Sequence, residues 1–131
     1  TGHLVFATLH TNSASQTIDR IVDVFPENQQ GQVKLQLSNV IEAVFSMRLI
    51  PSITGGRVPA FELMLGTTAI KTSVREGKTH QIDSIIQTSS EAGMSSLDAS
   101  LAAMVREGSI SMTVAQSWSL RPEELGRLVK R

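Results

Sequence analysis

The sequence of 131 residues has no cysteine and no tyrosine, and it contains only one tryptophan and four phenylalanines. Without cysteine, disulfides, thiolate metal sites and thiol nucleophiles are all excluded. So few aromatic rings leave little surface for stacking on unpaired bases, which argues against binding of single-stranded nucleic acid. Twelve basic residues balance twelve acidic ones, so no overall charge draws the chain to nucleic acid or to anionic lipid.

Long apolar runs are also lacking. The runs that exist fall far below the roughly 20 residues of a membrane-spanning helix, and no charged-then-apolar signal peptide opens the chain. A length of 131 residues is that of one domain. Because the chain begins with Thr1-Gly2 rather than methionine, we expect it to be a piece of a larger protein.

The first part of the sequence predicts a strand and two helices. Residues 3–9 are apolar and β-branched, too short a run for a stable helix, and they favour a buried strand. A helix follows, with Thr11, Asn12 or Ser13 available to cap its N-terminus, and it ends at Pro26. Apolar residues at helical spacing then predict a long amphipathic helix from 27 to about 47.

Glycine and polar residues divide the rest of the chain. Gly55-Gly56 lies between two extended runs, 49–53 and 57–65, and predicts a β-hairpin. After Gly66 the pattern becomes helical throughout. We expect four short helices and a fifth that starts near Pro122; the four cover residues 67–76, 80–92, 95–107 and 111–118.

The ends of these helices have recognisable caps. Gly77, Gly93 and Gly108 stand where helix C-terminal caps belong. Ser95 and Asp98 form a capping-box pattern ahead of the third of the four helices. The residues alone therefore predict a small piece of sheet followed by a helical bundle, with no self-contained active site.

Two sequence features suggest a phosphate-binding loop and a metal site, but the spacing of their residues supports neither. Gly77-Lys78-Thr79 resembles the end of a phosphate-binding loop, but the first glycine of that motif is absent, since Thr72 occupies its position. A helix cap followed by a turn explains these three residues better. His3 and His10 would lie ~23 Å apart on opposite faces of an extended strand, so they cannot share a metal ion, and we expect no metal site.

His10 is the better functional candidate of the two, although a hydrogen-bonded histidine at a strand end explains it equally simply. It follows a predicted buried strand, and open α/β sheets hold ligands at the carboxyl ends of their strands. Glu62 lies between Phe61 and Leu63, and we expect it to be a buried partner of an arginine. His80, between two predicted helices, favours a cap or a surface position.

An ordered series of motifs then resembles a known family. TGHLVFATLHTNSASQTIDRIVDVFP resembles the His box of the secretion ATPase superfamily, the hexameric RecA-like motors of type II secretion and type IV pili. QLSNVIEAVFSMRLIP, GGRVPAFELML and the tail SWSLRPEELGRLVKR resemble the continuation in the pilus retraction (twitching-motility) branch. AIKTSVRE corresponds to a helix that this branch usually writes AIRNLIRE. It keeps Ala69, Ile70, Arg75 and Glu76, and it differs at the four positions between them.

The resemblance implies a fold and a function. The fold class would be α/β, with residues 1–66 the C-terminal part of a RecA-like ATPase domain and residues 67–131 a C-terminal helical region. The P-loop, the Walker B segment and the arginine fingers precede the His box in the family. The chain alone is therefore expected neither to bind nor to hydrolyse ATP, whereas the full-length protein would use ATP and Mg²⁺ to power pilus retraction.

Partners and site residues are also implied by the resemblance. The full-length protein would be a homo-hexamer in the cytoplasm, peripheral to the inner membrane, working with a platform protein and without nucleic acid. His10 would contact the nucleotide, His3 would lie near the catalytic acidic groups, and Arg20 would pair with those groups or with a neighbouring subunit. The helix that carries Ala69, Ile70, Arg75 and Glu76 would couple the motor to its load.

Two alternatives remain open. Pilus extension and type II secretion ATPases share the scaffold, but they generally carry a four-cysteine zinc insertion that this sequence lacks. A non-enzymatic helical adaptor on the same scaffold is the second alternative.

Overall fold

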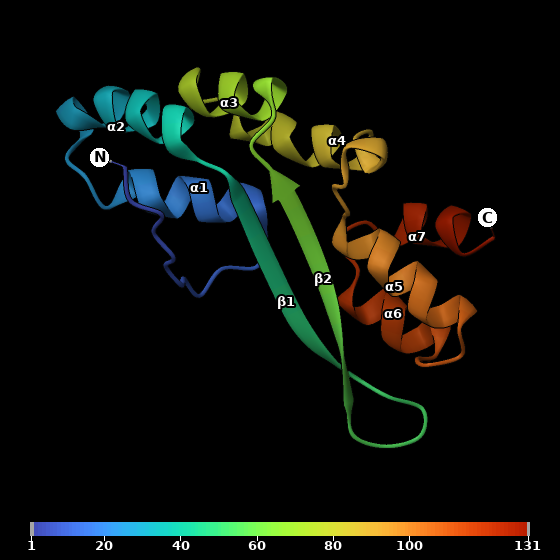
Figure 1. Ribbon diagram of the computed structural model, residues 1–131. Coiled ribbons are helices and arrows are strands. Elements are labelled where there is room, and N and C mark those ends of the chain that lie inside the picture. The colour runs from blue at the N-terminus through green and yellow to red at the C-terminus, as the bar shows by residue number, and fades with distance from the viewer. Residues whose placement is uncertain (1, 131) are drawn as a thin grey trace.

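The structure, a computed structural model, describes residues 2–130 and shows one β-hairpin with short helices at the end opposite its loop and along one side (Figure 1). This confirms the α/β class. In chain order the elements are α1 (Ala14–Asp23), α2 (Glu27–Val40), β1 (Ala43–Pro51), β2 (Arg57–Leu65), α3 (Thr68–Arg75), the 3₁₀ turn η1 (Thr79–Gln81), α4 (Ile82–Gln87), the 3₁₀ turn η2 (Ser90–Ala92), α5 (Leu97–Arg106), α6 (Met112–Trp118) and α7 (Pro122–Val129).

The hairpin confirms the prediction made from Gly55-Gly56. Strands β1 and β2 pair antiparallel, from Ala43 opposite Leu65 down to Pro51 opposite Arg57. Both glycines of the connecting loop have left-handed backbones, with φ of 96° and 70°. Residues with a side chain rarely adopt that conformation, so the two glycines allow the chain to reverse here.

The long helix expected over 27–47 is wrong in its last third. Helix α2 ends at Val40, and the chain enters β1 at Ala43. The apolar residues after Val40 follow the two-residue alternation of a strand, because they pair with β2. Gly66, directly after β2, holds the residues just before β1 in place: its N–H donates to the Glu42 carbonyl at 2.8 Å. A Cβ on Gly66 would collide with a neighbouring backbone carbonyl.

The strand expected over 3–9 is also wrong. Residues 2–12 form no helix or strand, and Leu4, Val5 and Phe6 are 75%, 78% and 88% exposed. An apolar run becomes a strand only where a neighbour accepts its backbone hydrogen bonds. Within residues 2–130, β1 and β2 pair with each other and no strand pairs with this segment.

Most predicted helix ends are confirmed. Ser13 caps α1 by accepting from the Gln16 N–H at 3.2 Å. Gly77 has φ 72° and ends α3, and the next N–H, of Lys78, returns to the Ser73 carbonyl at 2.8 Å. This is the helix-cap geometry expected for Gly77-Lys78-Thr79. Gly93 and Gly108, at φ 98° and 79°, have the same left-handed backbone.

Two predictions in the helical region need correction. The helix expected over 80–92 is divided into η1, α4 and η2, because the chain makes 3₁₀ turns on both sides of a six-residue helix. The cap of α5 is Ser96, which accepts from the Ala99 N–H at 3.1 Å, rather than Ser95. Asp98 does not complete a capping box, because its carboxylate binds residues 119–121 instead.

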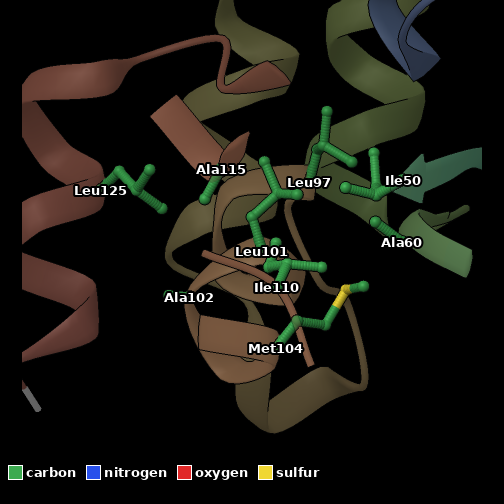
Figure 2. Packing of buried hydrophobic residues seen from close by; sticks show 9 residues of the cluster. All are labelled: Ile50, Ala60, Leu97, Leu101, Ala102, Met104, Ile110, Ala115 and Leu125. Atoms are coloured by element: carbon green, nitrogen blue, oxygen red, sulfur yellow. The ribbon is translucent and has the colours of Figure 1, made fainter. Parts of the chain in front are cut away.

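Two clusters of buried side chains hold the structure together. One joins α1, α3 and α4 to the end of β2 through Ala14, Ile18, Met64, Ile70, Val74, Ile82, Ile86 and Met94. The other joins α5, α6 and α7 to the half of the hairpin nearer its loop (Figure 2) through Ile50, Ala60, Leu97, Leu101, Ala102, Met104, Ile110, Ala115 and Leu125. We call these the α1–α4 cluster and the α5–α7 cluster. Each includes residues from both sides of Gly66, and the domain division at that residue stays a prediction.

Candidate functional site

The segment between His10 and α1 is tied to both strands of the hairpin. The Arg48 guanidinium of β1 donates to the Asn12 carbonyl at 2.8 Å. The Ala14 N–H, at the first residue of α1, donates to the Glu62 carboxylate of β2 at 2.8 Å. A third bond, from the Asn12 N–H to the Gln16 side chain at 2.6 Å, closes the turn into the helix. The chain just after His10 therefore has a defined place on the sheet.

The predicted catalytic residues lie on the surface. His3 and His10 are exposed in the irregular segment before α1, and Arg20 is exposed in the last turn of α1. In the part of the chain that the structure describes, no hydrogen bond or ion pair joins these three side chains to one another. Their roles stay predictions. His10 does not stand at the end of a strand, contrary to the expectation that first selected it.

Of the four residues of α3 and its C-cap that are expected to couple the motor to its load, one is buried and three are exposed. Ile70 belongs to the α1–α4 cluster and is buried, so it cannot contact a partner. Ala69, Arg75 and Glu76 are exposed. Arg75 donates to the Thr72 hydroxyl at 3.4 Å, while Glu76 pairs with the Lys78 ammonium at 3.4 Å. The outer side of α3 thus presents three of the four predicted residues.

Glu62 is buried, as expected, but its partner differs from the prediction. Only 4% of the residue is exposed, and its carboxylate accepts from the backbone N–H of Ala14 and also interacts with the backbone N–H of Leu97. Within residues 2–130 no arginine forms an ion pair with it. Burial raises the pKa of this carboxyl, and the negative charges of Asp83 and Asp98 raise it further, against the two N–H groups that lower it.

Two further carboxylates adjoin Glu62. Asp98 accepts from the Ser119 hydroxyl at 2.7 Å and from the N–H groups of Leu120 and Arg121 at 3.1 and 3.0 Å. The Arg121 guanidinium lies 3.8 Å from the Asp83 carboxylate. Asp83, Asp98, Leu120 and Arg121 line a cavity of about 20 Å³ together with Glu62. Sequence reasoning missed this network because its members come from four separate elements and form no motif.

Metal ions have no evident site here. Among residues 2–130, no three histidine, aspartate or glutamate side chains are placed to hold one ion. The same part of the chain has no helix with the length and apolar character needed to cross a bilayer.

Comparison with known proteins connects this geometry to a family. The family model described as "Type II/IV secretion system protein" matches residues 1–55. The chain is 49% identical over 123 residues to the type IV pilus retraction ATPase PilT of Pseudomonas aeruginosa, a match that covers 94% of this chain and 36% of that protein. It is 41% identical over 126 residues to a twitching motility protein of Neisseria gonorrhoeae, covering 95% of this chain and 34% of that protein.

A solved structure supports the same assignment. The crystal structure of the pilus retraction motor PilT with bound ADP matches with a TM-score of 0.84 and 45% identity, over 97% of this chain and 35% of that one. The chain is thus similar to type II/IV secretion system proteins over residues 1–55, and to the retraction motor over nearly its whole length. Within that class it is homologous to the PilT-type pilus retraction ATPases, which confirms the resemblance found in the sequence. The chain spans about a third of the length of these relatives.

Proposed function

We propose that this chain is the C-terminal region of a motor ATPase that powers retraction of type IV pili. The observation that carries the proposal is the match, over nearly the whole chain, to a pilus retraction motor whose crystal structure contains ADP. In the whole protein, ATP hydrolysis drives rearrangement of a homo-hexamer that acts with the pilus platform on the cytoplasmic side of the inner membrane. These assembly and location statements rest on the family resemblance.

The residues of this chain fit a supporting role at the nucleotide rather than a complete site. Gly77-Lys78-Thr79 ends a helix and does not form a phosphate loop. The phosphate cradle and the Mg²⁺ ligands therefore belong to the rest of the whole protein, as in its family. His10 is exposed, and the chain that follows it is anchored by Arg48 and Glu62. A neutral imidazole there donates a hydrogen bond to a phosphate oxygen and loses it when phosphate leaves.

The other site residues take the roles that the family implies. His3 lies near the catalytic acidic groups of the whole protein, and Arg20 pairs with those groups or with a neighbouring subunit. The exposed side of α3, with Ala69, Arg75 and Glu76, transmits the motion to the pilus machinery. Ile70 supports this helix from inside the α1–α4 cluster.

Two experiments test the proposal. The genomic sequence upstream of Thr1 should encode, in frame, a strand followed by G-x-x-x-x-G-K-[ST], the motif that holds nucleotide phosphates. If it does not, the motor function is wrong and the adaptor alternative is favoured. Deletion of the whole gene should leave cells with surface pili that no longer retract. Cells without pili would instead indicate the extension or secretion alternative.

A further inference from the structure

One buried carboxylate joins two helices that belong to different cores. Glu62, on β2, binds the N-terminal turn of α1, which begins the α1–α4 cluster. It also interacts with the backbone N–H of Leu97, the first residue of α5 in the α5–α7 cluster. Ala14 and Leu97 each stand directly after the N-cap serine of their helix. Glu62 thus accepts a hydrogen bond from the first residue of α1 and lines one cavity with the first residue of α5, although the two helices lie far apart in the sequence.

The chemistry of helix ends explains why a carboxylate fits here. The first N–H groups of a helix have no partner within the helix, and they carry partial positive charge. A carboxylate on β2 can therefore accept from the start of α1 while it faces the start of α5. Because Glu62 is almost fully buried, loss of this acceptor leaves the Ala14 N–H in the interior without its protein partner.

Backbone hydrogen bonds between β2 and the chain that leads into α5 hold Glu62 in place on the side of α5. Leu63, the next residue, exchanges two backbone hydrogen bonds with Ser95, at 2.8 and 3.1 Å, so that β2 is fixed to the chain entering α5. The neighbouring carboxylates are committed elsewhere: Asp98 binds residues 119–121, and Asp83 pairs with Arg121. Among the groups that line the cavity, Glu62 accepts from a backbone N–H of α1 at 2.8 Å, and Asp83 accepts from the Ser15 hydroxyl of α1 at the longer distance of 3.5 Å.

This contact lies close to the proposed phosphate sensor. Ala14 follows His10 by four residues, and the intervening Asn12 is held by Arg48. We propose that Glu62 is a positioning residue for ATP hydrolysis, which fixes the start of α1, and with it His10, against the C-terminal helices. This inference rests on the proposed function. It adds a residue outside the His box that decides where the His box histidine stands.

The test uses the full-length protein and compares Glu62→Gln with Glu42→Gln. Glu42 is an exposed glutamate that immediately precedes β1, so its variant controls for loss of one negative charge. We expect Glu62→Gln to lower kcat about tenfold, because a neutral amide oxygen accepts from the Ala14 N–H more weakly than a carboxylate, and small displacements of a reacting group have large effects on rate. KM for ATP should stay within about twofold, since the P-loop supplies most binding contacts. Amide hydrogen exchange at Ala14 should become faster in Glu62→Gln alone.

Stability separates positioning from a structural role. Because burial disfavours the charged form of Glu62, a neutral amide there should leave the melting temperature unchanged or higher at neutral pH. A fall in kcat without a fall in melting temperature therefore supports the proposal. Normal kcat in a folded Glu62→Gln protein, or parallel losses of kcat and melting temperature, overturns it. If this variant does not fold, Glu62→Asp, which keeps the carboxylate but shortens the side chain that reaches the Ala14 N–H, must lower kcat with KM preserved, and an unchanged kcat there also overturns the proposal.

Comparison of the wild type with His10→Ala and Glu62→Gln distinguishes failure of the proposed function from failure of the role of Glu62. If the wild-type full-length protein hydrolyses no ATP, the proposed function fails, and a positioning role for Glu62 fails with it. If the wild type is active and His10→Ala lowers kcat while Glu62→Gln does not, only the role of Glu62 is overturned.

Discussion

The two parts of the chain on either side of Gly66 differ in what they expose. Among described residues up to Leu65, large apolar side chains stand in water throughout, from Leu4 in the first segment to Phe45 on the hairpin, where it stacks on Phe61 at 5.6 Å between ring centres. Among described residues beyond Gly66, Leu120 alone is a large hydrophobic residue with comparable exposure.

This difference shows which part leaves apolar surface uncovered. The helical part buries its apolar residues, in part against Ile50, Ala60 and Met64 of the hairpin, whereas the first part keeps an apolar surface of the kind that other protein usually covers. The relatives are about three times as long as this chain. We therefore expect the rest of the whole protein, or a neighbouring subunit, to pack on the first part, and load-bearing contacts with other components to use the charged surface of the second.

The largest expected effect concerns that charged surface. Arg75→Ala in the full-length protein should abolish pilus retraction while ATP hydrolysis stays within about twofold of normal. Arg75 is exposed and donates only to the nearby Thr72 hydroxyl in the described chain, so its loss should cost little stability. Twitching motility and ATPase assays measure the two effects. Arg57→Ala, an exposed arginine beside the hairpin loop, is the control and should impair neither. Hydrolysis that collapses together with retraction would show that α3 has only a structural role.

The next effect is on stability and tests the comparison directly. Leu101 is completely buried in the α5–α7 cluster, whereas Leu4 is 75% exposed. Leu101→Ala should lower the free energy of unfolding by about 2–5 kcal/mol, through lost burial and the cavity left behind. Leu4→Ala should change it by less than about 0.5 kcal/mol. Urea unfolding of both variants measures this difference. Equal effects would mean that the first segment is packed in solution, contrary to the structure.

The sequence predicted those features that are decided locally. The hairpin loop, the caps of α1 and α3 and the left-handed glycines depend on residues within one turn, and all are confirmed. The strand over 3–9 and the end of the helix over 27–47 failed, because a strand depends on its partner rather than on its own residues. Val44 continues the helical spacing of α2, but pairing with Met64 makes it part of β1.

In the candidate site, too, local features could be predicted and contacts between distant residues could not. His10 was first selected from its place after an expected strand, which was wrong, and then from the contiguous His-box motif. The contacts that hold its segment join Asn12 to Arg48 and Ala14 to Glu62, which are 36 and 48 residues apart in the sequence. No local pattern specifies such pairs. An apolar environment around Glu62 was a usable signal of burial, yet it indicated an arginine partner where the fold supplies helix N-termini.

A smaller effect is expected at His10, in the part of the chain that exposes its functional groups. In the full-length protein His10→Ala should lower turnover about tenfold, within the range of one lost hydrogen bond to a charged group. KM should change little, because the P-loop dominates binding. His80→Ala is the matched control, since His80 is also exposed but lies beside α4. Unchanged turnover at saturating ATP would exclude a role for His10 in hydrolysis.

The smallest effect is a pH dependence at Glu62, where the two parts meet. Because burial raises the pKa of Glu62 in the folded chain above its usual value of 4.5, the folded state favours the protonated carboxyl. Its contribution to stability is therefore fully present below pH 4.5 and is lost as the pH rises through the raised pKa. Asp83 of α4 and Asp98 of α5 act in the same direction, while Arg121 pairs with Asp83. Glu62→Gln lacks this titration.

The measurement is the difference in free energy of unfolding between Glu62→Gln and the wild type, followed by urea unfolding from pH 4 to pH 8. The difference should shift in favour of Glu62→Gln as the pH rises through the raised pKa, because only the wild type must then bury a charge. Glu42→Gln, at an exposed position, should show a much smaller shift. A difference that moves the other way would mean that the N–H groups of Ala14 and Leu97 outweigh burial, and that Glu62 holds the two parts together most strongly when it is charged.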